Sequence, residues 1–300
     1  MLKNKFNKND IGALFASAVF ATFTVALIAS FVSQIFSVPQ DNNVLRIVQT
    51  AVNTIAIGSV AFIYAKASRT NVVTASKMNA KPPLAHIGWG CLATVCLIAF
   101  MLPLNMWISK LIVSLGLPDP SVDIDFDIAS LIILAAVLPA FFEEIVFRGA
   151  IAGALEGNKN KLASLAIAGA LFSLFHMNPA QTVHQFALGA LLALIFYRSG
   201  SLWTTVIIHF FNNIFVIALS AIFGDEAIDS FINNNAIWLF FVGLVCFAGC
   251  IVGYMFTTKS KWQSDNDEEP KYNRNCLILL IAAVAVCAAV WLTALIVSTE

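Results

Sequence analysis

Residues 128–154 read IASLIILAAVLPAFFEEIVFRGAIAGA, a long apolar run that is interrupted by Glu143, Glu144 and Arg148. A run of this length and composition predicts a transmembrane helix. A carboxylate at bilayer depth costs at least about 2.5–3.5 kcal/mol on insertion scales, so two adjacent ones need a compensating role. The run therefore predicts a functional site inside a membrane span.

The composition of the whole chain supports a membrane protein. Of the 300 residues, 59% are hydrophobic and only 11% are charged, against about 25% charged in average soluble domains. We expect an all-α, polytopic bundle that forms one membrane domain over residues 1–300. The candidate spans lie near residues 11–37, 45–65, 85–109, 128–154, 162–179, 182–198, 202–223, 236–257 and 276–298. Asn178 and Pro179 separate two short spans, so the count is eight or nine.

Positive charges predict the orientation, because lysine and arginine near span ends stay on the cytoplasmic side. Fourteen of the 17 lysines and arginines fall before the first span or in the second, fourth, sixth and eighth connections between consecutive spans, here called the even-numbered connections. Arg46 and Lys110 fall on the other side, where the connections are acidic, with Asp119, Asp123, Asp125, Asp127, Asp225, Glu226 and Asp229. We expect an integral protein of a bacterial plasma membrane with its N-terminus in the cytoplasm. No basic and aromatic surface favours nucleic-acid binding.

The three charges inside the fourth span have different expected partners. Residues four apart share a helix face, so Glu144 and Arg148 are predicted to form an internal ion pair. Glu143 points about 100 degrees away and is free to act chemically. One carboxylate is therefore expected to be structural and the other functional.

Backbone features around these charges predict a kinked and closely packed helix. Pro139 has no N–H to donate to the carbonyl of Ala135, which loosens the helix where water would enter. Gly149 and Gly153 have the small-xxx-small spacing that lets a neighbouring helix approach.

Two later spans carry further polar groups. Phe172 and His176 are four residues apart near the end of the fifth span, and His209 and Asn213 are four apart in the seventh. Counting places His176 nearer the outer side than His209, so their convergence requires tilt or a shortened fifth helix. Two other histidines match no motif and are expected to be structural: His86 and His184.

These polar residues also carry a family resemblance. The strings EEIVFRG at 143–149, FSLFH at 172–176 and HFFNN at 209–213 resemble, in order and spacing, the three motifs of the CPBP family of CAAX proteases and bacteriocin-processing endopeptidases. The string SGSLW at 199–203 is also typical of bacterial members. The resemblance covers residues 128–215, which leaves accessory spans at 11–109 and 236–298.

The resemblance implies a membrane-embedded protease that hydrolyses a peptide bond of a membrane-associated peptide or protein. The implied site residues are Glu143 as the base that activates water, His176 as its partner, Glu144 and Arg148 as holders of the geometry, and His209 and Asn213 as oxyanion stabilisers. A carboxylate in a low-dielectric environment suits the first role, because burial favours proton uptake. The implied partners are the substrate and the lipid bilayer, with the substrate and the oligomeric state left open.

A metal remains an alternative to purely glutamate-based catalysis. Glu143, His176 and His209 could supply three ligands to Zn²⁺, with water as the fourth. The sequence has no H-E-x-x-H string and no cysteine suited to this role, so we favour a metal-independent mechanism and commit to no cofactor.

Two other functions remain open from the sequence. Glutamate and histidine inside spans also build proton relays, as in a proton-coupled transporter. Such a transporter is expected to show inverted repeats, and no internal symmetry is visible here. A non-catalytic immunity or scaffold protein of the same family is the other alternative, and the complete motif set argues against it.

Overall fold

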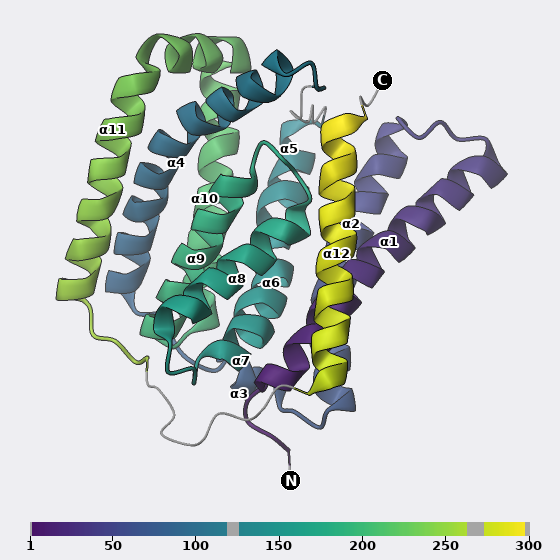
Figure 1. Ribbon diagram of the computed structural model, residues 1–300, viewed down its shortest axis with the longest axis vertical. Coiled ribbons are helices and arrows are strands. Elements are labelled where there is room, and N and C mark those ends of the chain that lie inside the picture. Colours follow the sequence, from purple (N-terminus) through teal and green to yellow (C-terminus); the bar gives the residue numbers. More distant parts are fainter. Residues whose placement is uncertain (1, 119–125, 263–272, 298–300) are drawn as a thin grey trace.

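The computed structural model describes residues 2–118, 126–262 and 273–297. Within these ranges every element is helical, and seven helices are long and apolar enough to cross a membrane. They are α1 (Ile11–Phe36), α2 (Asn43–Ala67), α4 (Leu84–Ser114), a helix at Ile128–Leu155, α10 (Leu202–Phe223), α11 (Asp225–Thr257) and α12 (Arg274–Ile296). The protein is therefore a polytopic helical membrane bundle (Figure 1).

The bundle separates the basic connections from the acidic ones. Figure 1 shows the start of the chain and the connections at residues 68–83, 156–160 and 200–201 at one end, and the end of α12 at the other. Arg46, near the start of α2, and Lys110, near the end of α4, lie toward the second end. Four charged residues used in the sequence argument lie outside the described residues: Asp119, Asp123, Asp125 and Lys271.

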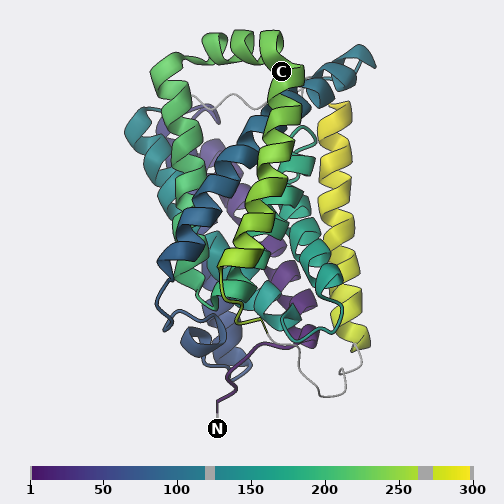
Figure 2. The ribbon, with the colours of Figure 1, turned by 90° about the vertical axis from the view of Figure 1, so that its left-hand side faces the viewer.

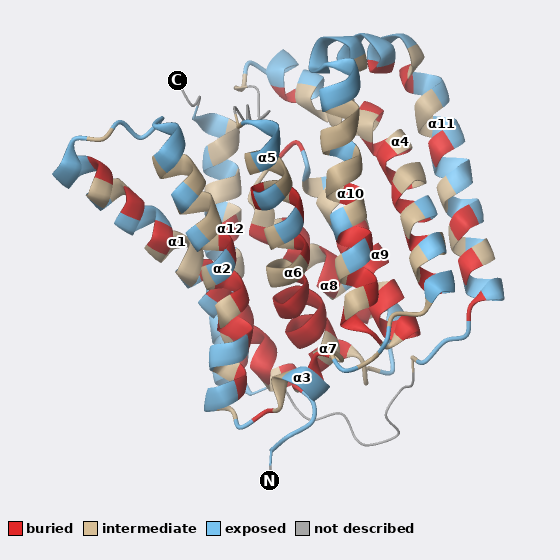
Figure 3. Cartoon of the chain, turned by 180° about the vertical axis from the view of Figure 1, so that it is seen from behind, coloured by how far each residue is buried: buried red, intermediate tan, exposed pale blue. Residues whose placement is uncertain are grey.

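The helix at Ile128–Leu155 carries Glu143, Glu144 and Arg148 and is here called the glutamate helix. It contacts α1, α2, α8, α9 and α10. Figure 3 shows that its lower part, which carries the charges, is mostly buried. The helix changes geometry four times, through α5 (Ile128–Leu131), a π-helical segment at Ile132–Val137, α6 (Leu138–Glu144), a second π-helical segment at Ile145–Ala152 and α7 (Gly153–Leu155).

A helical hairpin supplies the fifth and sixth expected spans. It consists of α8 (Lys161–His176) and α9 (Thr182–Ser199), and Figure 1 shows its connecting turn below the upper ends of α4 and α10. α8 ends three residues before the expected position because Met177 adopts a left-handed conformation, with φ of 49°, and Pro179 follows. The expected eight or nine spans thus correspond to seven long helices and this shorter hairpin within the described ranges.

α11 begins well before the expected eighth span at 236–257. Gly224, with φ of 76°, ends α10, and the new helix starts directly at Asp225. Asp225 and Glu226 lie in its first turn, where negative charge is favourable. Figure 2 shows these first turns crossing the top of the bundle before the helix descends. The hydropathy pattern finds only the descending part because the crossing part is polar.

The glycine pair of the glutamate helix packs against a connection between spans. A Cβ atom on Gly149 would lie 2.7 Å from Cβ of Ser76, the residue that follows the short helix α3 (Val72–Ala75). At Gly153 the nearest contact, to the carbonyl oxygen of Ala75, would be 3.6 Å. The close approach predicted from the glycine spacing is therefore made by the end of α3, and Gly149 is the residue that permits it.

Candidate active site

A buried ion pair forms on the glutamate helix, as its spacing predicts. Arg148 Nη1 lies 2.8 Å from Glu144 Oε1, and the two side chains are 2% and 0% exposed. The second terminal nitrogen of the guanidinium, Nη2, donates to the carbonyl of Gly189 on α9 at 3.4 Å. Glu144 and Arg148 therefore join the glutamate helix to the α8–α9 hairpin.

Glu144 also holds His209 of α10. His209 Nδ1 lies 2.9 Å from the same Oε1 atom that contacts Arg148. A carboxylate only accepts hydrogen bonds, so Nδ1 carries the hydrogen and Nε2 is left for another partner. The sequence did not predict this contact, because 65 residues separate the two side chains.

Glu143 faces a different histidine. His176 Nε2 lies 4.0 Å from Glu143 Oε2, and these side chains remain 23% and 14% exposed. His176 Nδ1 donates to the carbonyl of Phe172 at 2.7 Å, which leaves the Nε2 lone pair directed at the carboxylate. The site thus has a sealed half around Glu144 and a more accessible half around Glu143.

The ring of Phe172 lies between the two halves. The guanidinium carbon of Arg148 is 4.2 Å from its centroid, within cation–π range. The imidazoles of His176 and His209 are 4.6 and 6.0 Å away, centroid to centroid. Phe172 is fully buried. It therefore packs against three of the polar site residues.

Asn213 contacts the backbone of the glutamate helix. Its Nδ2 donates to the carbonyl of Ala135 at 2.8 Å, the carbonyl that Pro139 cannot serve. Its Oδ1 accepts a hydrogen bond from Nδ2 of Asn212 at 2.9 Å. The second amide hydrogen of Asn213 is left for another acceptor. Asn212 is a buried site residue that sequence reasoning missed, although the paired asparagines at 212–213 were visible.

The two π-helical segments lie on either side of the glutamates. Ile132–Val137 ends one residue before α6, and Ile145–Ala152 begins directly after Glu144. π-helical turns are rare and occur frequently at functional sites. Because π-helical turns are wider than α-helical ones, they change the directions of Glu143 and Glu144 around the helix axis relative to the ends of the span. The kink expected at Pro139 does not by itself predict this change.

The remaining two histidines have different surroundings. His86 is buried, and its Nδ1 lies 2.8 Å from the hydroxyl of Tyr254, which is a structural contact. His184 lies in the first turn of α9, and its side chain is partly buried.

The arrangement of the possible metal ligands bears on whether this site can hold a metal ion. Among the described residues, no three histidine, cysteine, aspartate or glutamate side chains gather closely enough to hold one. His209 is paired with Glu144, whereas His176 faces Glu143. The set of Glu143, His176 and His209 therefore does not fit a three-ligand zinc site in this arrangement.

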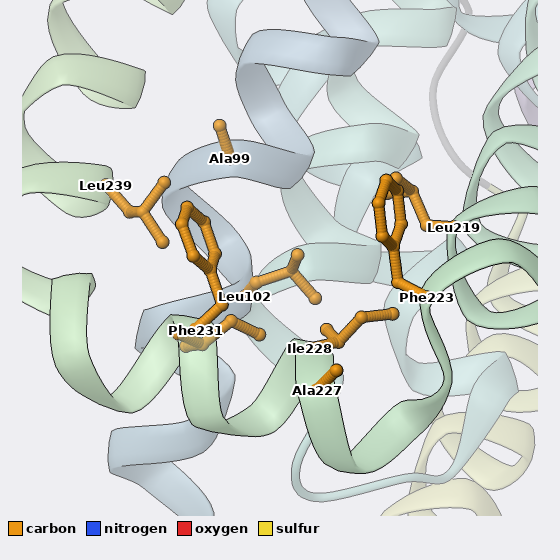
Figure 4. Close-up of a pocket in the computed structure, with 9 residues that line it drawn as sticks. Ala99, Leu102, Leu219, Phe223, Ala227, Ile228, Phe231 and Leu239 are labelled. Carbon is orange, nitrogen blue, oxygen red and sulfur yellow. The ribbon is translucent and has the colours of Figure 1, made fainter.

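An apolar cavity elsewhere in the bundle contains none of the motif residues. It has a volume of about 460 Å³ and lies between α4, α10 and the first turns of α11 (Figure 4). Leu102, Phe223 and Phe231 are among the side chains that line it. The residues that line it include no titratable group.

The fold and the cluster define a helical membrane protein with paired carboxylates and imidazoles at its centre. The family described as type II CAAX prenyl endopeptidase Rce1-like has a model that matches residues 125–215. This match supports the CPBP/CAAX protease family for the chain, and that family supports protease activity in general. No curated protein and no solved structure matches the chain.

Proposed function

We propose that this protein is an intramembrane endopeptidase that hydrolyses a peptide bond of a membrane-associated peptide or protein. The observation that carries the proposal is the facing pair of Glu143 and His176. Their 4.0 Å separation exceeds a direct hydrogen bond, and one water molecule bound by both groups suits it. This is the accessible half of a site that is otherwise closed.

Glu143 is the proposed general base. Its carboxylate removes a proton from water as the water oxygen bonds to the carbonyl carbon of the substrate. The same proton then passes from Glu143 to the amine that leaves when the C–N bond breaks. His176, with its lone pair on Nε2, accepts a hydrogen bond from the water and holds it in line.

His209 is the proposed donor to the oxyanion. Because Nδ1–H points to Glu144, His209 can donate from Nε2 only as an imidazolium. In that state two carboxylates, one guanidinium and one imidazolium balance to zero charge, which favours a buried cluster. Donors aimed at a forming oxyanion typically contribute a few kcal/mol each. The remaining N–H of Asn213 is a second candidate donor.

The proposed setting is a bacterial plasma membrane with the lysine-rich end in the cytoplasm. The basic connections at one end of the bundle support this orientation. Prenylated C-terminal sequences, bacteriocin leaders and membrane-protein segments are all candidate substrates under the proposal.

Comparative peptidomics tests the proposed activity. Membranes are compared from cells that express the wild type, Glu143→Gln, and a matched control, Glu156→Gln, which alters a partly exposed carboxylate at the end of the glutamate helix. We expect cleavage products in the wild type and the control that disappear in Glu143→Gln at equal protein abundance. A parallel sample with a chelator reports on metal. Unchanged products in Glu143→Gln would favour a non-catalytic or transport role.

A further inference from the structure

The C-terminal helix α12 reaches the turn that follows His176. Trp291, in the upper part of α12, donates its indole N–H to the hydroxyl oxygen of Thr182 at 2.8 Å. Thr182 is the first residue of α9, and the turn between α8 and α9 lies directly before it. Figure 1 shows the upper part of α12 beside this turn. A helix outside the matched residues 125–215 therefore contacts the part of the hairpin that carries His176.

Thr182 holds the chain on both sides of His176. Its hydroxyl donates to the carbonyl of Asn178 at 2.8 Å, and its own carbonyl accepts from the hydroxyl of Ser173 at 2.7 Å. Asn178 follows His176 in the turn, and Ser173 precedes it in the last turn of α8. The end of α8 and the turn after it are thus tied to one residue of α9.

The end of α8 depends on contacts from outside the helix. The last carbonyl groups of an α-helix lack partners within it, and helix ends open more easily than helix centres. His176 is the final residue of α8, and Met177 after it leaves the helical conformation with φ of 49°. The position of the His176 imidazole therefore depends on what holds the turn.

Trp291 completes a chain of hydrogen bonds through Thr182. The hydroxyl of Thr182 has a single hydrogen, which it donates to Asn178, and its oxygen accepts from Trp291. Consecutive hydrogen bonds of this kind strengthen each other where the local dielectric is low. An indole N–H in an apolar span keeps such a partner, because lipid offers it none.

α12 is itself anchored, so it can support this contact. A Cβ atom on Gly12 of α1 would collide with the carbonyl of Cys276 of α12, so the two helices pack backbone to backbone there. The ring of Phe15 on α1 contacts that of Phe175, the residue before His176. Two helices outside the matched region thus act on the same end of α8.

We propose that Trp291 is a positioning residue of the active site, which acts through Thr182 to set how His176 faces Glu143. This inference rests on the proposed endopeptidase function and makes α12 part of the catalytic unit. The two side chains lie 4.0 Å apart, with the proposed water between them. A misplacement of about 1 Å can lower the rate about 100-fold, so a small movement of the turn is sufficient to matter.

The test compares variants that remove single hydrogen bonds. Trp291→Phe keeps a large ring and loses the N–H donor. Trp262→Phe is the matched control, because it removes the hydrogen bond from an indole N–H to the carbonyl of Glu156, 3.0 Å long, at the other end of the bundle. Thr182→Val removes the hydroxyl, and Thr182→Ser keeps it. We measure kcat and KM in nanodiscs with a substrate found by peptidomics.

We expect Trp291→Phe to lower kcat about tenfold with KM nearly unchanged, because His176 holds the water and not the substrate. Thr182→Val should have a similar effect, and Trp291→Phe/Thr182→Val should be no slower than Thr182→Val alone, since both changes break one chain. Thr182→Ser and Trp262→Phe should keep their kcat. A kcat for Trp291→Phe equal to that for Trp262→Phe would overturn the assignment.

A spectroscopic measurement separates this inference from the proposed activity. The chain has four histidines, so isotope-labelled histidine gives a small set of imidazole resonances in nanodiscs, and His176→Gln identifies those of His176. We expect Trp291→Phe to shift the His176 resonances and Trp262→Phe to leave them in place. If the wild type cleaves no peptide, the proposed activity fails, and these shifts alone decide whether Trp291 positions His176. Unchanged His176 resonances in Trp291→Phe would refute the positioning role.

Discussion

Asn213 on α10 donates its side-chain amide to the carbonyl of Ala135 on the glutamate helix, at 2.8 Å. In a regular α-helix that carbonyl would accept from the residue four positions later, which is Pro139 and has no N–H. A side chain 78 residues away in sequence therefore donates to a carbonyl that Pro139 cannot serve. This links the proline, the π-helical segment and a motif residue in one structural relationship.

Asn213→Ala should destabilise the protein by about 1–3 kcal/mol, because it removes the donor of a partly buried hydrogen bond. Pro139→Ala restores an N–H that can serve the same carbonyl. The loss caused by Asn213→Ala should then be smaller in the Pro139→Ala background, with a coupling energy of at least about 0.5 kcal/mol. Denaturant unfolding in detergent micelles measures the four proteins of this cycle.

Additive effects in the cycle would show that Pro139 and Asn213 do not share the carbonyl. Asn212→Ala serves as the matched control, since Asn212 contacts Asn213 and not Ala135. Its cost should not depend on residue 139.

Glu144→Gln should cost about 3–5 kcal/mol of stability, since it leaves the buried Arg148 without a counter-charge. The double variant Glu144→Leu/Arg148→Met removes both charges and should be less destabilised than the single variant. Thermal unfolding compares them. Glu156→Gln is the control, because its ion pair with Lys77 is partly exposed and should contribute no more than about 1 kcal/mol. A Glu144→Gln protein as stable as this control would contradict the buried pair.

Gly149→Ala should destabilise the protein by about 1–3 kcal/mol, because the added methyl group would lie 2.7 Å from Ser76 Cβ. Gly153→Ala, four residues later, meets nothing nearer than 3.6 Å and should be neutral or stabilising by up to about 1 kcal/mol. The melting temperatures of the two variants report the difference. Equal effects would mean that α3 does not pack on Gly149 as described.

Phe172→Leu should lower kcat about tenfold on a substrate found by peptidomics, because its ring contacts Arg148 and both site imidazoles. A desolvated cation–π contact contributes about 2 kcal/mol. Phe15→Leu is the matched control, since Phe15 is equally buried and its ring contacts that of Phe175. The control should lose similar stability and keep its kcat. Equal kcat values in the two variants would reduce Phe172 to ordinary packing.

Local spacing predicted the parts of the site that lie on one helix. The Glu144–Arg148 pair follows from residues four apart, and the divergence of Glu143 follows from the helical period. The shortened α8 is one of two solutions that the depth argument allowed, and it is signalled by Asn178 and Pro179. These features depend on neighbours in sequence.

The contacts between helices could not be predicted in the same way. His209 contacts Glu144, and Asn213 contacts Ala135. Both contacts depend on how α10 is rotated about its axis against the glutamate helix. The π-helical segments depend on this packing as well, because hydrophobic periodicity does not distinguish them from α-helix. The polar first turns of α11 were missed because a hydropathy pattern identifies apolar membrane spans. It does not identify polar helical turns that cross the top of the bundle.

The central claim is that the Glu143 carboxylate activates water beside His176. The most direct test measures kcat/KM for the wild type, Glu143→Gln and Glu143→Asp in nanodiscs, with a substrate identified by peptidomics. We predict that Glu143→Gln lowers kcat/KM by about 10²–10⁴ at an unchanged melting temperature, the typical range for general-base catalysis. Glu143→Asp should retain part of the activity. A Glu143→Gln enzyme within about threefold of the wild type would contradict the account.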